Sequence, residues 1–330
     1  MIFATSFFMK LDAQDLHFSQ FQYSPMNLGP SEAGNMDVDL RVAGLHRRQW
    51  ASVTVPYQTF AVSIDGKLNA LNDKLKGLGA GLLINQDKAG DGALQTLQLT
   101  LALSYSFALT KDSVYFLHVG VNGGFVQKNL DVTKLNFDNQ FDGDNFIPQS
   151  PNGETFDRTN YTYADVGFGA GWSAHYAKNS WNAGIQFQHL NRSDLSYYNS
   201  EKVKLPILSQ LHVGSDFIFN EKISLLPAIN FMMQDNFQEL NLGMEAKLTM
   251  RNESAKRYAV GLGLFYRTSD ALIPMISLYY NKFRFGFSYD INTSSLKKAS
   301  NYRGGPEITL IYMAKKIKSN SQRRIICPLY

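Results

Sequence analysis

The sequence predicts an all-β protein, a fourteen-stranded antiparallel transmembrane β-barrel of the outer membrane. Two observations predict it. Apolar and polar residues alternate along many segments, and the connections between those segments are alternately short and long. A period of two gives a strand one apolar face and one polar face. An even number of strands lets an antiparallel sheet close with both ends on one side.

The clearest alternation lies in residues 257–292. Within residues 283–291, aromatic and aliphatic side chains occupy one face, while Arg, Gly, Ser and Asp occupy the other. Across the predicted strands, Gly, Ser, Ala, Asn and Gln dominate the polar face, where a soluble sheet would carry Lys, Glu and Thr. The pattern is typical of a wall with lipid outside and a crowded aqueous lumen inside. An ordinary β-sandwich, whose strands also alternate, is the alternative.

Composition agrees with a barrel. No run of about 18 apolar residues is present, so no transmembrane helix is expected. The mean hydropathy of -0.22 does not exclude a membrane protein, because only alternate residues of a barrel strand face lipid. The net charge of +4 comes with no basic stripe of interleaved aromatic residues, so nucleic acid is not an expected partner. Outer-membrane lipid is an expected partner.

The alternation places the strands along most of the chain. Gaps after even-numbered strands, such as 178–179 and 281–282, are mostly short, whereas 128–160 and 191–204 follow odd-numbered strands and are long. Outer-membrane barrels have short periplasmic turns and longer external loops, so both termini are expected in the periplasm. The predicted strands are 38–43, 60–65, 76–85, 97–107, 113–127, 161–176, 181–188, 205–219, 222–234, 237–250, three within 257–292, and 305–313.

Four regions follow from this organisation. Residues 1–13 resemble a truncated secretory signal, with a short apolar run that ends at Ala13. Residues 14–35 are aromatic but broken by proline and glycine, and residues 36–314 form the barrel. Residues 315–330 form a basic tail. At up to about 3.3 Å per residue, the 14–35 segment can cross a barrel interior, and we expect it to plug the lumen. Its packed side chains would be Phe18, Phe21 and Tyr23.

No catalytic arrangement is recognisable. The six histidines are scattered, and Asp87 and Asp91 have a calcium-loop spacing without the later glutamate. Cys327 is the single cysteine, which excludes an internal disulfide and a multi-cysteine metal site. We therefore expect a protein that is not an enzyme and holds neither cofactor nor metal.

The strand phase places several charged side chains in the lumen. Strand one must pair with strand fourteen on closure, so Asp39 and Arg41 are expected near Glu307 and Arg284. Because both signs are mixed, a structural ion-pair network is favoured over a selectivity lining. The predicted network comprises Asp39, Arg41, Glu245, Arg267, Arg284, Asp290 and Glu307.

Aromatic residues in the predicted external loops are candidates for partner binding, since stable interfaces have aromatic cores. The alternative is that they pack the loops against one another. The tail is a second candidate contact, with a periplasmic partner, or else a solvated terminus. The loop candidates are Trp50, Phe137, Phe141, Phe146, Phe156, Tyr197 and Tyr198, and the tail candidates are Arg323, Arg324, Cys327 and Pro328.

Four stretches resemble the PorP/SprF family. Residues 14–21 (QDLHFSQF) resemble the family opening, with Leu16 where proline is usual. Residues 47–50 (RRQW) resemble the end of its first strand. Residues 287–308 contain FSYD, SSL and GPEI, which resemble the family's closing strands, and residues 327–330 (CPLY) resemble its Cys-Pro-Arg-Phe terminus. Their order and spacing extend over nearly the whole chain.

The resemblance implies an outer-membrane barrel of type IX secretion and gliding motility in Bacteroidetes. It implies a role in the export and surface attachment of large proteins with a type-B C-terminal domain. It also implies periplasmic or lipoprotein components of the same machinery as partners. The alternative function is an outer-membrane porin or uptake channel for small or apolar solutes, which would need an open lumen.

Overall fold

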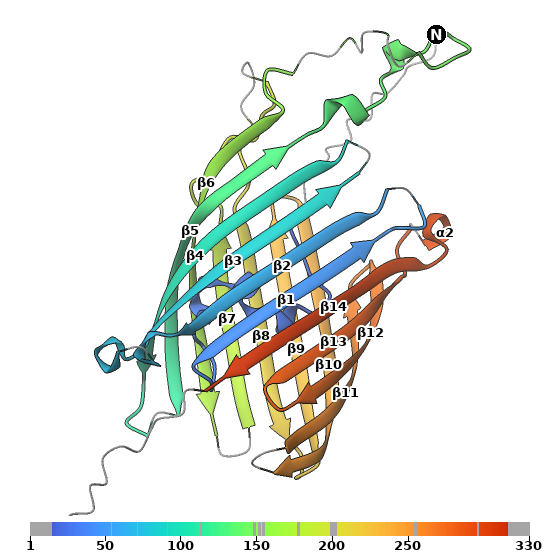
Figure 1. Cartoon of the computed structure of the whole chain (residues 1–330). Helices are drawn as coiled ribbons and strands as arrows, with labels where there is room; N and C mark the ends of the chain where they lie inside the picture. Colours follow the sequence, from blue (N-terminus) through green and yellow to red (C-terminus); the bar gives the residue numbers. More distant parts are fainter. Residues whose placement is uncertain are drawn as a thin grey trace, which may run out of the picture.

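The computed structural model describes residues 15–315 except 54, 71, 91, 113, 148–149, 151–152, 154–155, 177–178, 199–202, 254–255 and 296. Within them the chain forms one antiparallel sheet of fourteen strands that closes as a barrel, with β1 pairing to β14 (Figure 1). The predicted fold class is confirmed. No helix in the described part is long and apolar enough to cross a membrane.

Each predicted strand is present, with ends that differ by a few residues. The largest change is in the first strand, which is predicted to end at residue 43 and ends at Gln49. The strands are β1 (Leu40–Gln49), β2 (Tyr57–Lys67), β3 (Leu78–Ala89), β4 (Leu94–Ala108), β5 (Tyr115–Asn129), β6 (Asn160–His175), β7 (Asn179–Gln188), β8 (Leu208–Ile218), β9 (Ile223–Gln234), β10 (Phe237–Glu253), β11 (Lys256–Arg267), β12 (Ala271–Tyr280), β13 (Phe283–Asn292) and β14 (Arg303–Ala314).

The outer wall is apolar and the inner wall is polar, as the alternation predicts. In β4, Leu101 and Leu103 are 63% and 56% exposed, whereas Ala102 between them is 3% exposed. Thr100 and Ser104 face inward with Ala102 and are buried. A continuous exposed leucine surface of this kind is unfavourable in water and is typical of a lipid-facing wall.

The two ends of the barrel differ. Connections after odd-numbered strands lie at one end, here called the loop end, which carries the long segments 130–159 and 189–207 (Figure 1). The opposite turn end carries short connections such as 219–222 and 281–282. One turn-end connection, 68–77, is an exception. It is longer and contains the 3-10 turns η3 (Leu68–Ala70) and η4 (Asp73–Leu75).

An aromatic belt surrounds much of the turn end. Its side chains come from the last residues of even-numbered strands and the first residues of odd-numbered ones, and they pack in pairs. Such belts mark a boundary between hydrocarbon and water. The pairs are Tyr105 with Phe107, Tyr115 with Trp172, Trp181 with Phe217, Tyr258 with Tyr280, and Phe283 with Tyr312.

Residues 15–36, here called the lumenal segment, lie inside the barrel (Figure 1). Asp15 meets His189, which directly follows β7 at the loop end. The backbone N–H of Gly34 donates to Asp65 near the turn end of β2. The segment therefore runs lengthwise through the lumen and contains η1 (Phe21–Tyr23), α1 (Pro25–Leu28) and η2 (Pro30–Glu32).

This route separates the first described residue from the end of the last strand. Leu40 pairs with Ala314, so β1 begins and β14 ends at the turn end, as an even strand count requires. Asp15, however, lies at the loop end, at the other end of the lumen from Ala314. Asp15 and Ala314 therefore lie at opposite ends of the lumen, because the lumenal segment crosses the barrel before β1 begins. The termini lie outside the described residues, and their periplasmic location stays a prediction.

Candidate functional site

The candidate site is the contact between the lumenal segment and the inner wall. Phe18, Phe21 and Tyr23 are 5%, 4% and 1% exposed, so all three side chains of the predicted plug are buried. Phe21 packs edge-on against Phe265, the one large aromatic ring that β11 turns inward. The segment's helical turns are three or four residues long and close on themselves, whereas the backbone N–H groups of Ser19, Gln20 and Gly34 donate to carboxylates of the wall.

Glycines in the wall make room for this segment. A Cβ at Gly81 would lie 2.6 Å from Met26, and one at Gly120 would lie 2.5 Å from the backbone of Pro30. A Cβ at Gly286 would lie 2.7 Å from the ring of Tyr23. These distances are below any normal carbon contact, so the wall is shaped to the segment on both sides of the barrel.

Glu307 of β14 binds the backbone of the segment directly. Its two carboxylate oxygens accept the N–H groups of Ser19 and Gln20 at 2.8 and 2.7 Å. The Gln20 side-chain amide donates to the Glu307 backbone oxygen at 2.8 Å and to Ser288 at 3.0 Å. Charge-assisted hydrogen bonds of this kind are stronger than neutral ones, and here they are shielded from water.

Two arginines complete this cluster. Arg47 of β1 donates to Asp290 at 2.7 Å and lies 3.6 Å from Glu307, and Arg267 of β11 also pairs with Asp290. Ser19 donates to Asp290 at 2.6 Å and accepts from Arg267 at 2.9 Å. All four charged side chains are at most 3% exposed. Four strands and the lumenal segment thus share one buried ion network.

Arg47 was not among the predicted lumenal charges. The register places Arg47 opposite Glu307, whereas Arg41 lies opposite Met313. The expected proximity of Asp39 and Arg41 to Glu307 is therefore wrong. Arg41 instead pairs with Asp65 at 2.8 Å on β2, beside Gly34. Strand phase could have identified Arg47, because it has the same inward phase as Arg41 along an uninterrupted strand.

A second polar cluster holds Tyr23. Glu245 of β10 accepts from the hydroxyls of Tyr23 and Tyr279 at 2.8 and 2.7 Å, and from Ser277. The guanidinium of Arg284 lies 5.1 Å from the Tyr23 ring centre and 4.7 Å from that of Tyr279, in cation-π geometry. The seven predicted lumenal charges are thus divided among separate clusters. The backbone N–H of Asp39 donates to the backbone oxygen of Ala314.

At the loop end, His189 lies between two carboxylates. Its two ring nitrogens lie 2.6 Å from Asp15 and 2.8 Å from Asp165. Burial alone would lower the pKa of His189, but the two carboxylates outweigh it and raise the pKa to about 10. Burial likewise opposes ionisation of Asp15, yet the charge and hydrogen bond of His189 lower its pKa. The ion pair between His189 and Asp15 anchors Asp15, the first described residue of the lumenal segment.

The anchor should persist across neutral pH. A histidine with a raised pKa contributes stability that is present below its unfolded pKa of about 6.5 and is lost as the pH rises through about 10. Asp15, with a lowered pKa, loses its contribution only in acid. An NMR titration of the His189 ring should show no deprotonation below pH 8. Asp15→Asn should lower the pH midpoint of the His189 titration. Asp112→Asn is the control, because Asp112 is exposed, and it should leave that midpoint unchanged. Titration of His189 near 6.5 would contradict this.

The loop-end aromatic residues form contacts with one another. Phe156 stacks on Tyr198 at 5.7 Å, and Tyr197 meets the Tyr161 ring edge-on at 5.5 Å, so connections 130–159 and 189–207 pack together. Phe141 and Phe146 form a separate pair at 5.2 Å, in which Phe141 remains 56% exposed.

The remaining two loop-end candidates lie apart from these pairs. Phe137 is half-buried, and its backbone N–H donates to Gln140 at 3.0 Å. Trp50 lies in the β1–β2 connection and packs edge-on against Tyr57 at 5.0 Å. The seven candidates are therefore not one cluster.

Three other predicted features lie wholly or partly outside the described residues. The tail residues Arg323, Arg324, Cys327 and Pro328 and the predicted signal at 1–13 lie outside the described residues. Asp91 of the calcium-like spacing lies outside them too. Among the side chains that the structure describes, no group of three or more His, Cys, Asp or Glu could hold a metal ion.

Comparisons with known proteins bear on identity. Residues 10–312 match the family model described as the type IX secretion system membrane protein PorP/SprF. No curated protein matches the chain.

Several solved barrels are similar in outline. The toluene transporter TodX of P. putida is 10% identical, with a TM-score of 0.47 over 88% of this chain and 93% of that one. A FadL homologue of Pseudomonas aeruginosa is 10% identical, with a TM-score of 0.46 over 86% and 92%. The CymD monoaromatic hydrocarbon channel is 9% identical, with a TM-score of 0.45 over 89% and 93%.

Likeness at that level carries no argument about function. The family match is different in kind, because it extends over nearly the whole chain and includes the lumenal segment and all but the last residues of β14. It confirms the resemblance found in residues 14–21, 47–50 and 287–308. The chain belongs to the PorP/SprF family of type IX secretion system membrane proteins.

Proposed function

We propose that this protein is a closed outer-membrane barrel of the type IX secretion and gliding machinery. In this proposal it receives a secreted surface protein with a type-B C-terminal domain at its loop end and does not conduct that protein through its lumen. The loop end faces outward and the turn end faces the periplasm. Membership of the family supports a secretion component, and with the barrel fold it supports a non-enzymatic one.

The occupied lumen is the observation that carries this proposal. Residues 15–36 bind β14 through Glu307, β10 through Glu245 and β2 through Asp65. Displacing a segment that is held from several directions by buried charged groups is energetically costly, because its removal leaves those buried groups without their hydrogen-bond partners. Passage of a folded or unfolded polypeptide would require its removal.

The same observation weighs against the alternative of a porin or uptake channel. A channel of that class needs a continuous open lumen. Two of the similar barrels are described as a monoaromatic hydrocarbon channel and a toluene transporter, and those descriptions belong to those proteins. Orientation is supported by the short connections at the turn end, since bacterial barrels have short periplasmic turns.

The loop-end surface can be tested at Phe141. Its side chain is 56% exposed, whereas Phe156, Tyr197 and Tyr198 hold the loops together. A central aromatic contact in an interface contributes about 2 kcal/mol or more, which corresponds to roughly thirtyfold in affinity. Phe141→Ser should therefore release the surface protein from cells that make it, measured by surface immunoblotting, while the barrel level stays constant.

The matched control is Phe219→Ser. Phe219 is 78% exposed in connection 219–222 at the turn end, so this substitution removes an exposed ring from the opposite face. Retention of the surface protein should be normal in this variant. Normal retention in Phe141→Ser would show that Phe141 is not part of the docking surface. Release of the surface protein in both variants would point to a general defect of the barrel.

A further inference from the structure

The lumenal segment does not fill the turn end of the barrel. A cavity of about 570 Å³ remains there between residues 34–37, the connection 68–77 and the inner wall of β4, β5 and β6. This volume is within the range of about 300–1,000 Å³ that is typical of ligand sites. The long 68–77 connection forms one of its walls, so the feature that breaks the short-turn rule also borders the cavity.

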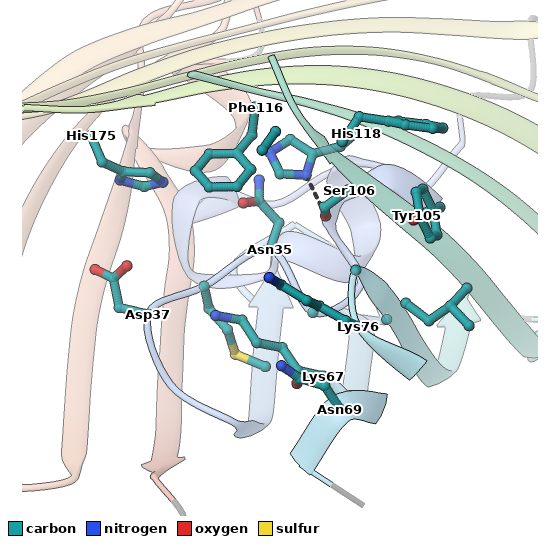
Figure 2. A pocket seen from close by; sticks show the side chains of 17 residues that line it. Asn35, Asp37, Lys67, Asn69, Lys76, Tyr105, Ser106, Phe116, His118 and His175 are labelled. Carbon is teal, nitrogen blue, oxygen red and sulfur yellow. Dashed lines mark hydrogen bonds between the residues drawn. The ribbon is translucent and has the colours of Figure 1, made fainter. Parts of the chain in front are cut away.

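The lining brings basic and aromatic groups together. Figure 2 shows His175, Phe116 and His118 along one side of the cavity, with Lys67 and Lys76 on the other and Asn35 between them. Phe116 lies 6.2 Å from the His118 ring and 6.0 Å from that of His175. The aromatic ring of Phe116 therefore lies across the cavity from the ammonium groups of Lys67 and Lys76.

The two kinds of basic group differ in their freedom to bind a ligand. His118 is fixed in the wall, because its ring nitrogens both lie 2.8 Å from hydroxyls, those of Ser106 and Ser173. Lys67 and Lys76 are not bound in this way. Among the described residues, neither ammonium group has an acidic oxygen within salt-bridge distance. A single carboxylate, that of the exposed Asp37, shares the lining with them.

We propose that this cavity is a docking site for a short acidic peptide segment of a partner protein that approaches from the turn end. Lys67 and Lys76 would pair with its carboxylates, and the side-chain amides of Asn35 and Asn69 would bind its backbone. Recognition of acidic motifs by clustered cations is a recurrent mode of peptide binding. The site does not depend on the proposed role of the loop end, because no residue is shared between the two.

The site also lies next to the lumenal segment. Asn35 lies at the end of the segment and Asp37 directly follows it, and Ser104 of the wall fixes this end by donating to the Ala33 backbone oxygen. An occupant would therefore contact both the 68–77 connection and the base of the lumenal segment. Contact with both parts of the chain distinguishes specific binding in this cavity from nonspecific electrostatic binding to a basic surface.

The test measures binding of fluorescein-labelled hexaglutamate to the full chain in detergent, by fluorescence anisotropy. Hexaglutamine is the uncharged comparison peptide. Lys67→Gln combined with Lys76→Gln should weaken hexaglutamate binding about tenfold, since the variant lacks two partly exposed ion pairs of up to about 1 kcal/mol each. Lys74→Gln is the matched control, because Lys74 is exposed in η4 of the same connection but does not line the cavity.

A gain-of-binding variant guards against misfolding. Asp37→Asn removes the one carboxylate in the lining and should strengthen hexaglutamate binding about twofold to threefold, which a damaged barrel would not do. Heat-modifiable migration checks that each variant is folded. If the double lysine variant fails this check, Lys76→Gln alone replaces it, since Lys76 is exposed.

Three outcomes would overturn the proposal. The first is absence of saturable hexaglutamate binding to the native protein. The second is equal weakening of binding in Lys74→Gln and in the lining variant, which indicates a nonspecific basic surface. The third is complete competition by free glutamate or inorganic phosphate at matched carboxylate or phosphate concentration, which would assign the cavity to small anions instead of a peptide.

Discussion

Deleting residues 15–34 should convert the closed barrel into an ion-conducting pore. A fourteen-stranded barrel is wider than the small barrels whose side chains fill their own interiors, so closure here depends on the lumenal segment. Once the segment is gone, water can enter and hydrate the polar wall. In planar bilayers the deleted protein should show large, stable conductance steps, and the intact protein should show none.

A matched pair of glycine substitutions tests the same idea without a deletion. Gly286→Leu places a side chain where Gln20 and Tyr23 lie, so it should displace the segment and open the lumen. Gly44→Leu is the control, because a side chain there meets open space outside the wall. Stable pores in the intact protein would favour the channel alternative. A silent deletion variant would mean that something other than residues 15–34 closes the barrel.

Arg47→Ala should be among the most destabilising single substitutions in the wall. It leaves Asp290 with Arg267 as its remaining paired cation and removes the cation that lies within salt-bridge distance of Glu307, in a region that is almost fully buried. Breaking a buried ion pair by removing one partner costs about 3–5 kcal/mol. The free energy of unfolding in detergent, measured by urea titration with heat-modifiable migration as the readout, should fall by that amount.

Arg48→Ala is the neighbouring control. Arg48 is exposed on the other face of β1, so its removal should change the free energy of unfolding by less than about 0.5 kcal/mol. Arg47→Lys should give an intermediate result, because a lysine keeps the charge but cannot reach two carboxylates in the planar geometry of a guanidinium. Equal stability of the Arg47→Ala and Arg48→Ala proteins would show that the buried network does not hold β1 to β13 and β14.

The alternation of inward-facing and outward-facing side chains along each strand accounts for the features that could be predicted from neighbouring residues. Whether Leu101 faces lipid or Ala102 faces the lumen depends on strand phase alone, so the wall could be deduced residue by residue. The same phase identified the inward charges Glu245, Asp290 and Glu307. The aromatic residues of 14–35, set among prolines and glycines, indicated a buried segment that is not a strand.

The partners of those charges were decided only by the closed barrel. Strand phase says that a side chain points inward, but the stagger between β1 and β14 determines that Arg47, rather than Arg41, faces Glu307. That stagger is a property of the whole sheet, since it must close the ring. Loop contacts such as Phe156 with Tyr198 also join segments far apart in sequence, and no local pattern specifies them.

The path of residues 15–36 shows the same division. The sequence by itself determined a fourteen-stranded wall, its lipid face, its charged interior and a segment suited to enter it. Only the tertiary structure decided that this segment runs from His189 at the loop end to Asp65 at the turn end, which separates Asp15 from Ala314. The physical reason is that alternation acts between adjacent residues of one strand, whereas the route through the lumen depends on complementary shape and charge from many strands at once.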